Sequence, residues 1–592
     1  MPEYKSPQSE PGNEQRFLLV ILVMAAVIFG SQFLLRKFGR QPPANSARPN
    51  QTTQAAPSQS QATPAQSTSA PAQASAVLPR APKAPASVST KQAASETETV
   101  IENDLYRITF TNRGAQAKSW VLKKYLDDKG KQLDLVNQNA AAKFGYPLSL
   151  WTYDDGLRTK LSSALYVSSA SGTLNAPSKL EFEYSDAGLT VKKTFEFDHT
   201  YVVQVITSVF QNDAPVWAFP AWPAGFGDQS SLAAYASGQF EYQVNADAEH
   251  IAAKKVSGGG TLRGTYNWVG TSTSYFGAVF IPDNTDNLTV VTLHNPMDFV
   301  ADPAKPNEAK PVDVLGVAAG HPGETSARMF VGPKALDVLD STPVPSIIGA
   351  EKDLRKLVNF GWFSALARPL FSWPYIGLRW VYGYVHNWGW AIVIQTFFIT
   401  ILLLPLRIYQ MKSALKMQKV QPQMKAIQEK YKKYSMRDPR KQDMQKEIGE
   451  LYKEHGVNPV SGCLPLLVQM PFFIAYYKML SAAIELRQAH WLWIGDLSAS
   501  DFILPLIMAG SMFLVQKMTP QAGMDPAQQR MMTVMMPVMM GFFFFRLPAG
   551  LNLYYAESNL ISIAQQFIMN RTKLGREIRD AAAKKAKKKG SS

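Results

Sequence analysis

Polar side chains recur at helical spacing within segments of the sequence that are otherwise apolar. In the run VIQTFFITILLLPLR, residues 393–407, Thr396 and Thr400 are four positions apart and therefore share one helix face, with Gln395 beside them. Each unpaired polar group costs free energy in hydrocarbon, so intramembrane polar residues tend to face an interior or a watery path. The chemistry that these groups predict is hydrogen bonding within a wet cavity between helices.

Two further apolar segments could complete the walls of that cavity. A second polar stripe has spacings of four, three and four positions, and its members are Tyr555, Asn559, Ser562 and Gln566. The run LLVQMPFF supplies Gln469 and Met470 as a third wall. Serine and threonine in spanning helices also bond their own backbone or join two helices, at about 0.6 kcal/mol per contact. That structural role stays open for each position.

The sequence offers little that could hold a metal or a cofactor. Its single cysteine, Cys463, allows no intrachain disulfide and no zinc quartet. His250, His294 and His321 are too scattered to predict a metal site. The glycine-rich run SGGGTLRG, residues 257–264, lacks the strand-to-helix context of a phosphate loop. We therefore expect no cofactor, no metal and no enzymatic activity.

The polar stripes belong to apolar segments that are long enough to cross a bilayer, which needs roughly 20 residues in a helix. Six such segments are predicted: 17–35, 389–406, 463–480, 502–516, 531–545 and 550–569. The first has basic flanks and no small-x-small site directly after it, which favours an uncleaved signal anchor over a cleaved signal peptide. Residues 351–388 are rich in tryptophan and tyrosine, which predicts an amphipathic interfacial region, with a buried aromatic core as the alternative.

The chain between the first and second apolar segments differs from them in composition and in hydrophobic pattern. Residues 41–96 are rich in Ala, Pro, Gln, Ser and Thr and contain no aromatic residue, so they predict a disordered linker. Residues 97–345 contain alternating runs such as LYRITFTNRG and KLEFEYSDAG, which predict a β-sandwich. The expected fold class is membrane α-helical, with six transmembrane helices and a five-helix core, plus a large extracytoplasmic antiparallel β-sandwich domain.

The whole chain has a net charge of +15. The distribution of this charge along the sequence predicts how the segments are oriented across the membrane. Residues 407–453 hold thirteen Lys and Arg against five Asp and Glu, and the tail from residue 571 holds nine against two. By the positive-inside rule both face the cytoplasm. The loop 481–501, with one basic and three acidic residues, suits the outer side. Residues 1–16, the loop 517–530 and the tail 570–592 are then cytoplasmic, and the β-sandwich lies outside.

The basic cytoplasmic segment 407–456 carries a helical apolar pattern of its own. Its members are Met417, Val420, Met424, Ile427 and Tyr431, followed after Pro439 by Met444, Ile448 and Leu451. This predicts two antiparallel helices that form a basic hairpin. The charge of the hairpin and of the tail favours anionic lipid headgroups or ribosomal RNA as partners, with an ordinary solvated helix face as the alternative.

Several longer motifs resemble those of the YidC/Oxa family of membrane protein insertases. They are NPVSGCLPLLVQMPFFIAYYKML, ELRQAHWLWIGDLSASDFILPLIM, FLVQKMTP, DPAQQRMM and LPAGLNLYYAESNL. The resemblance covers nearly the whole chain, and the outer domain with its anchor is similar to the Gram-negative bacterial form, in which that domain is a β-supersandwich. It implies a multi-pass protein of the cell inner membrane, with its large domain in the periplasm and both termini in the cytoplasm.

The resemblance also implies an activity and partners. Such a protein inserts and folds nascent inner-membrane proteins, alone or with the Sec translocon, and hydrolyses no nucleotide. The polar stripes would line its groove and contact the client. The ribosome and anionic lipids are further expected partners, and DNA is not. A secondary transporter or channel is the alternative, but we find no self-similar halves, and an enzyme acting on sugars would need converging carboxylates at an outer cleft.

The sequence departs from the family pattern at two positions. The family usually places an arginine where this chain has Thr400, which predicts a polar but uncharged groove centre. Arg407 lies seven residues further on, roughly 10 Å along a continuous helix, and is expected at the groove mouth. Glu557 is the second departure. It could pair with Arg546, bind water or carry a proton, and these alternatives stay open.

Overall fold

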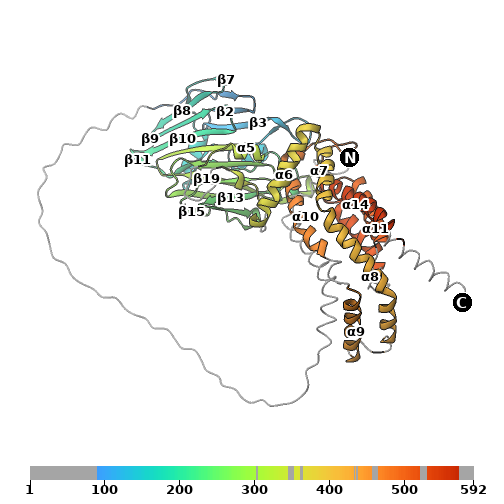
Figure 1. The fold of residues 1–592 in the computed structure, drawn as a ribbon. Helices are drawn as coiled ribbons and strands as arrows, with labels where there is room; N and C mark the ends of the chain where they lie inside the picture. Colours follow the sequence, from blue (N-terminus) through green and yellow to red (C-terminus); the bar gives the residue numbers. More distant parts are fainter. Residues whose placement is uncertain are drawn as a thin grey trace, which may run out of the picture.

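The structure is a computed structural model that describes residues 90–301, 304–344, 353–359, 364–431, 434, 438–456, 464–519, 530–572 and 576. The predicted signal anchor, most of the predicted linker, Cys463 and residues 577–592 of the tail lie outside this described part. Figure 1 shows two regions, a β-region near one end and a helical region that extends away from it.

The β-region consists of three sheets. The first has the order β4 (Gln132–Asp134), β3 (Gln116–Leu126), β2 (Tyr106–Thr111), β1 (Glu98–Glu102) and β7 (Gly172–Asn175). The second has the order β14 (Asp247–Ala252), β13 (Gln239–Val244), β16 (Trp268–Ser272), β17 (Phe276–Pro282), β20 (Glu324–Pro333), β10 (Val202–Gln211), β9 (Leu189–Phe197), β8 (Ser178–Asp186) and β6 (Val167–Ser168), with β11 (Ala214–Pro215) on β10. The third has the order β15 (Thr261–Gly264), β18 (Leu288–Phe299), β19 (Lys310–Gly320), β12 (Ala218–Trp222) and β5 (Leu150–Thr152).

The alternating sequence pattern accounts for these strands. In β10 every second side chain is buried, as expected for a strand with one face on a core. In β17 all seven residues are buried, because this strand lies in the middle of its sheet and is covered on both faces. The core includes the fully buried Trp120, Trp222 and Trp268. The predicted β-domain is therefore present, although one pair, β1 with β7, runs parallel rather than antiparallel.

Short helices lie between the strands. They are α2 (Gln138–Phe144), α3 (Asp155–Ser163), α4 (Leu232–Ala236) and α5 (Leu336–Asp340). The first three begin at side chains that accept a backbone N–H, namely Asn137, Asp154 and Ser231.

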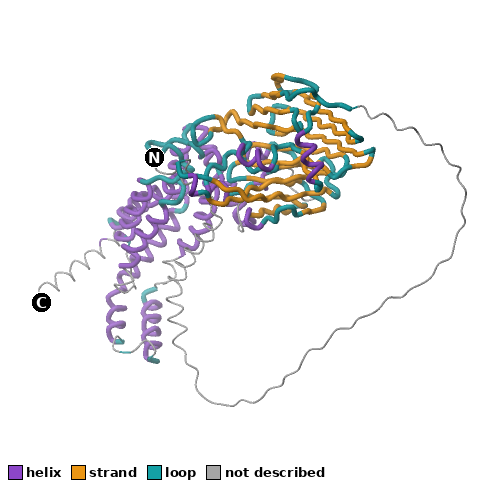
Figure 2. The backbone as a smooth tube through the Cα atoms, turned by 180° about the vertical axis from the view of Figure 1, so that it is seen from behind, coloured by secondary structure: helices purple, strands orange, loops and turns teal. Residues whose placement is uncertain are grey.

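The helical region begins with α6 (Ser364–Val385) and continues through further helices. These are α7 (Trp388–Leu402), α8 (Leu404–Lys430), α9 (Arg440–Glu454), α10 (Leu464–Ala482), α11 (Ile503–Met518), α13 (Met536–Phe544) and α14 (Ala549–Asn570). A short 3-10 turn, η6 (Ile484–Leu486), follows α10, and one stretch of π-helix, η7 (Met531–Met535), precedes α13. Figure 2 shows that the helices gather in one bundle beside the β-region.

By length and composition, none of the helices in the described ranges qualifies alone as a membrane span. Residues 388–402 and 404–413 qualify together as a pair bent by 56°. The expectation of six transmembrane helices therefore stays a prediction. The bend itself differs from the single straight segment expected over 389–406. Its cause is Pro405 in the first turn of α8, because proline lacks an N–H and favours the start of a helix.

Helix α6 has apolar side chains on two faces. Tyr375, Leu378 and Val381 are buried against the rest of the bundle. A second row at spacings of four, Ile376, Trp380 and Tyr384, is 62%, 62% and 70% exposed. One of these buried residues and two of the exposed row are aromatic, so the choice between an interfacial region and a buried aromatic core stays open. The place of α6 at a membrane surface stays a prediction.

Helices α8 and α9 lie side by side at the end of the bundle that is remote from the β-region (Figure 1). Their contact contains Val420, Met424, Ile448 and Leu451, which are the apolar positions of the sequence pattern. At the end of α8 from which the chain continues to α9, Tyr431 donates a hydrogen bond to Glu447 at 2.8 Å. A small apolar core of this kind holds two helices together while their charged faces stay exposed.

Candidate functional site

Gln395 joins three helices at the end of the bundle nearest the β-region. Its side chain is buried, and its amide nitrogen donates to the carbonyl of Pro374 in α6. Its amide oxygen accepts a hydrogen bond from the hydroxyl of Tyr476 in α10 at 3.0 Å. Gly377 makes room for this contact, since a Cβ there would lie 3.0 Å from the Gln395 amide nitrogen. We call Gln395, Thr396 and Tyr476 the outer tier.

The two threonines of α7 bond to their own helix. The Thr396 hydroxyl donates to the carbonyl of Ile392 at 2.7 Å, and the Thr400 hydroxyl donates to the carbonyl of Thr396 at 2.7 Å. Their exposed fractions are 0% and 4%. This is the backbone-bonding role that the sequence left open for each of them. Both hydroxyls therefore have a partner inside α7.

Arg407 lies further along the same chain, beyond the bend. The sequence predicted that Thr400 and Arg407 lie on one continuous helix. The bend instead places Thr400 in α7 and Arg407 in α8. The half-buried guanidinium of Arg407 donates to the hydroxyl of Ser562 in α14. Ser562 in turn donates to the carbonyl of Ser558 at 2.6 Å. We call Arg407 and Ser562 the inner tier, which links α8 to α14.

The other members of the α14 stripe have different neighbours. The Asn559 amide donates to the hydroxyl of Ser511 in α11 at 3.1 Å. Gln566 is buried and donates to Asn570 of its own helix at 2.8 Å. The ring of Tyr555 lies edge-on to Phe473 of α10, with centroids 5.4 Å apart. The stripe thus contacts α8, α10 and α11 rather than a single wall.

Two expected positions belong to a described helix whose side chains are only partly described. Gln469 and Met470 lie in α10, but their side chains fall outside the described part of the structure. Their role in a third wall stays a prediction. Tyr476, which the sequence reading missed, lies seven positions after Gln469 on the same helix face. That heptad spacing was the signal that could have found it.

Glu557 lies on α14 beside Thr396, and one of its oxygens, Oε2, is buried without a hydrogen-bond partner. Arg546, a partner considered from the sequence, is exposed. Among the described residues, no ion pair joins Glu557 to a basic side chain. The pairing with Arg546 is therefore not made in this structure.

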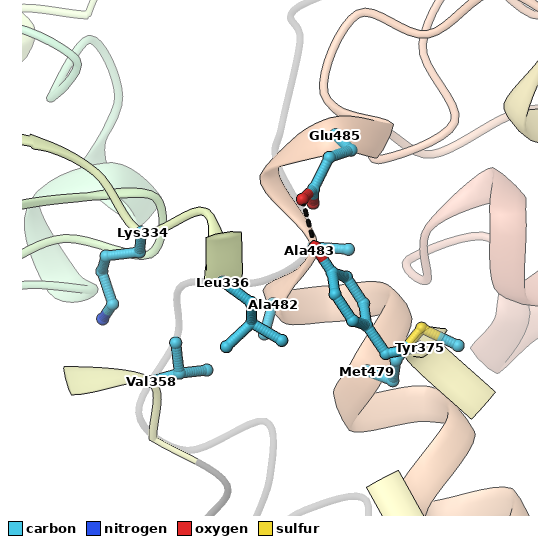
Figure 3. Close-up of a pocket in the computed structure, with 8 residues that line it drawn as sticks. All are labelled: Lys334, Leu336, Val358, Tyr375, Met479, Ala482, Ala483 and Glu485. Atoms are coloured by element: carbon cyan, nitrogen blue, oxygen red, sulfur yellow. Dashed lines mark hydrogen bonds between the residues drawn. The ribbon is translucent and has the colours of Figure 1, made fainter. Parts of the chain in front are cut away.

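A small cavity marks the junction between the β-region and the bundle. Figure 3 shows the residues that line it, which are Lys334, Leu336, Val358, Tyr375, Met479, Ala482, Ala483 and Glu485. The Tyr375 hydroxyl donates to Glu485, drawn as a dashed line in Figure 3. Burial raises the pKa of the Glu485 carboxyl, and this hydrogen bond opposes the shift. The carboxyl is thus held at the seam between the two regions.

A buried polar network lies behind this cavity in the β-region. Lys334 donates to the Ser272 hydroxyl at 3.1 Å and to the carbonyl of Thr273 at 3.2 Å. The fully buried Glu241 accepts from Ser272 at 3.0 Å, and its carboxylate lies 3.1 Å from Nδ1 of His250. Burial lowers the pKa of Lys334, while the Glu241 charge opposes that change. The network anchors the edge of the β-region that faces the helices.

Comparison with known proteins covers both regions. A family model described as 60Kd inner membrane protein matches residues 380–576, and one described as YidC periplasmic domain matches residues 98–373. The membrane protein insertase YidC of Geotalea uraniireducens is 34% identical over 80% of this chain and 87% of its own length. That of Geobacter metallireducens is 32% identical over 94% and 98%. The chain belongs to the YidC family of membrane protein insertases.

Solved structures of the YidC family also match. A crystal structure of an active YidC insertase with its first transmembrane domain resolved is 22% identical, covers 82% of this chain and 95% of its own, and has a TM-score of 0.33. The YidC of Thermotoga maritima is 12% identical, with coverages of 79% and 99% and a TM-score of 0.25. The family resemblance that the sequence motifs suggested is therefore confirmed. The chain is a membrane insertase, and it contains a YidC periplasmic domain.

Proposed function

We propose that the chain inserts and folds nascent inner-membrane proteins, alone or with the Sec translocon, through a hydrophilic groove among α7, α8, α10, α11 and α14. The observation that carries the proposal is the inner tier, in which the half-buried Arg407 bridges α8 to Ser562 of α14. Asn559 and Ser511 extend this polar lining to α11. A client segment in this groove would exchange bonds to water for bonds to these side chains.

The physical benefit lies in the polar flank of the client. An apolar helix enters lipid downhill, but its flank must cross about 30 Å of hydrocarbon. Each unsatisfied polar group in that layer costs several kcal/mol. A lining of hydroxyl, amide and guanidinium groups lowers this cost because it offers partners partway across. The apolar client supplies the driving force, so the proposed mechanism requires no nucleotide hydrolysis.

The arrangement of the two tiers supports a groove that is closed at one end. The outer tier is buried and its donors are bonded within the protein. In the inner tier Arg407 is half-buried and Ser562 is buried. Arg407 lies near the start of α8, the helix that continues into the α8–α9 hairpin. A flank that entered from the hairpin side would therefore stop below the β-region. Under this proposal the hairpin and both termini are cytoplasmic, and six helices cross the inner membrane.

The basic surfaces belong to the same proposal. The hairpin and the tail would approach anionic lipid headgroups or the ribosome, since clustered lysine and arginine attract both. The exposed row Ile376, Trp380 and Tyr384 of α6 would lie at the outer headgroup level. No feature of the described residues specifically favours the transporter or channel alternative.

Substitution of Arg407 tests the proposed groove. In cells depleted of their own insertase, Arg407→Ala should reduce translocation of a short polar client tail several-fold, because the groove loses its charged donor. Arg407→Lys should retain much of the activity. The measurement is protection of the tail from cytoplasmic protease in a single-span client. Arg263→Ala, a change at an exposed arginine on β15 of the β-region, is the matched control.

A second measurement addresses the wetness of the groove. Cysteines introduced at Asn559 or Ser562, in a Cys463→Ala background, should react with a water-soluble thiol reagent in membranes. A cysteine at the lipid-exposed Phe542 should stay unreactive. Unchanged tail translocation in Arg407→Ala together with unreactive groove cysteines would refute the groove.

A further inference from the structure

Glu557 is an acidic side chain among the helices that has no basic partner in the described structure. Its Oε2 atom is buried and makes no hydrogen bond. The residue as a whole is half-buried, so part of its side chain is exposed on α14. A carboxylate that loses its water without gaining a donor is costly, and an arriving donor or cation therefore binds it favourably.

The neighbours of Glu557 are polar but uncharged. Thr396 lies within hydrogen-bonding reach of the carboxyl, and its hydroxyl also donates to the carbonyl of Ile392 at 2.7 Å. Tyr476 also lies near, but its hydroxyl donates to Gln395 at 3.0 Å. Thr396 and Tyr476 are thus neutral neighbours of Glu557, and no basic side chain pairs with it among the described residues. A positive charge for this carboxylate has to come from outside the cluster.

Glu557 and Arg407 occupy different depths in the proposed groove. Glu557 lies beside the outer tier, and Ser562, which holds Arg407, is five residues further along α14. Five residues of helix correspond to roughly 7.5 Å along its axis. The groove therefore has a basic group at its mouth and an acidic group near its closed end.

We propose that Glu557 is a specificity-determining residue that favours client flanks carrying a lysine, an arginine or a free amino terminus. The proposal rests on the groove function proposed above. A basic flank that passes the inner tier reaches the carboxylate and provides the donor that Oε2 lacks. An acidic flank meets a like charge at the same place in a low dielectric, where repulsion is strong. The charge preference of the insertase is then set at the closed end as well as at the mouth.

The test compares three single-span clients that differ at one tail position, which is Lys, Gln or Glu. The full-length chain is expressed in cells depleted of their own insertase, and tail translocation is measured by protease protection. With the parent chain, the Lys-tailed client should exceed the Glu-tailed client. In Glu557→Gln this ratio should fall several-fold, with the Gln-tailed client unchanged, because the carboxamide keeps the shape and loses the charge.

Additional variants separate charge selection from folding. Glu557→Asp should retain the ratio, and Glu557→Lys should invert it. Glu485→Gln, which neutralises a carboxyl at the junction instead, should leave the ratio unchanged. An unchanged ratio in Glu557→Gln, or an equal loss for all three clients, would overturn the proposal. If Arg407→Ala still impairs tail translocation in that case, the groove stands and only the role of Glu557 fails.

Discussion

Single buried polar residues in the β-region illustrate how burial and hydrogen bonding compete. Lys193 is fully buried, yet its ammonium donates to the carbonyls of Gly114, Ala115 and Leu148 at 2.8, 2.9 and 2.9 Å. Asp228 has fewer partners. Its Oδ2 accepts from the Thr273 hydroxyl at 2.8 Å, and its Oδ1 is buried without one. Burial raises the pKa of Asp228 from 3.8 to about 6.

Asp228 should make the stability of the β-region depend on pH. Its folded-state pKa lies above the unfolded value, so the folded state holds the proton more tightly. The associated stability is present below pH 4 and is lost as pH rises through about 6. We expect Asp228→Asn to remove that loss and to raise the free energy of unfolding at pH 7.5, by on the order of 1–3 kcal/mol.

Hydrogen exchange of β16 and β17 amides in the detergent-solubilised chain, at pH 5 and pH 7.5, would measure this effect. Asp104 is exposed, so Asp104→Asn is the control and should change the exchange rates neither at pH 5 nor at pH 7.5. Identical exchange in the parent chain and Asp228→Asn at pH 7.5 would contradict the prediction.

At the scale of elements, small residues decide how closely the helices approach. A Cβ on Gly541 of α13 would lie 2.8 Å from the Cβ of Ala509 in α11, which is below a normal contact distance. Gly510 follows Ala509 in α11, and nothing lies within 4 Å of a Cβ placed on Gly510. In a membrane, lipid tails are as apolar as the helix surfaces, so there is no hydrophobic gain when two helices associate. Small residues favour association because they let the backbones approach closely and pack well. The contact between α11 and α13 therefore depends on Gly541.

Gly541→Val should separate α11 from α13 and destabilise the bundle by about 1–3 kcal/mol, since overpacked cores cost energy of this size. Gly510→Val faces open space and should be close to neutral. Unfolding of both variants in a titration with denaturing detergent provides the comparison. Equal midpoints for the two variants would show that the helices can part without cost.

At the scale of the whole molecule, a seam of polar contacts orients the β-region on the bundle. Arg487, just after η6, donates to the carbonyl of Leu126 at 2.7 Å. Gln488 donates to the carbonyls of Leu126 and Asp127 at 3.3 and 3.1 Å. Tyr375 and Glu485 add the bond seen in Figure 3. These contacts connect the turn after β3 to the segment between α10 and α11.

Removing this seam should loosen the two regions without unfolding either. We expect Arg487→Ala combined with Gln488→Ala to lose about 1 kcal/mol for each hydrogen bond. Distances between spin labels on β3 and on α11 should then spread over a broader range. Arg440→Ala on the remote hairpin should leave the distribution unchanged. A narrow distribution in the double variant would assign the orientation to the remaining contacts, which are the Tyr375–Glu485 bond and the apolar packing.

The sequence by itself determined the features that consecutive residues encode. Alternation of side chains predicted the β-domain, and spacings of three and four predicted the α8–α9 hairpin through Val420, Met424, Ile448 and Leu451. The same spacing placed Thr396 with Thr400 and Asn559 with Ser562 on shared helix faces. These patterns are local, because the geometry of a strand or helix repeats over a few residues.

Only the tertiary structure decided what those faces meet. It paired Gln395 with Tyr476, Asn559 with Ser511 and Arg407 with Ser562, across 81, 48 and 155 positions of the chain. The structure also shows a bend between Thr400 and Arg407. These two residues are seven positions apart in one apolar segment, yet they belong to different helices of the bundle. The physical reason is that a distant partner is chosen by how whole helices pack, and no short-range period in the sequence records that choice.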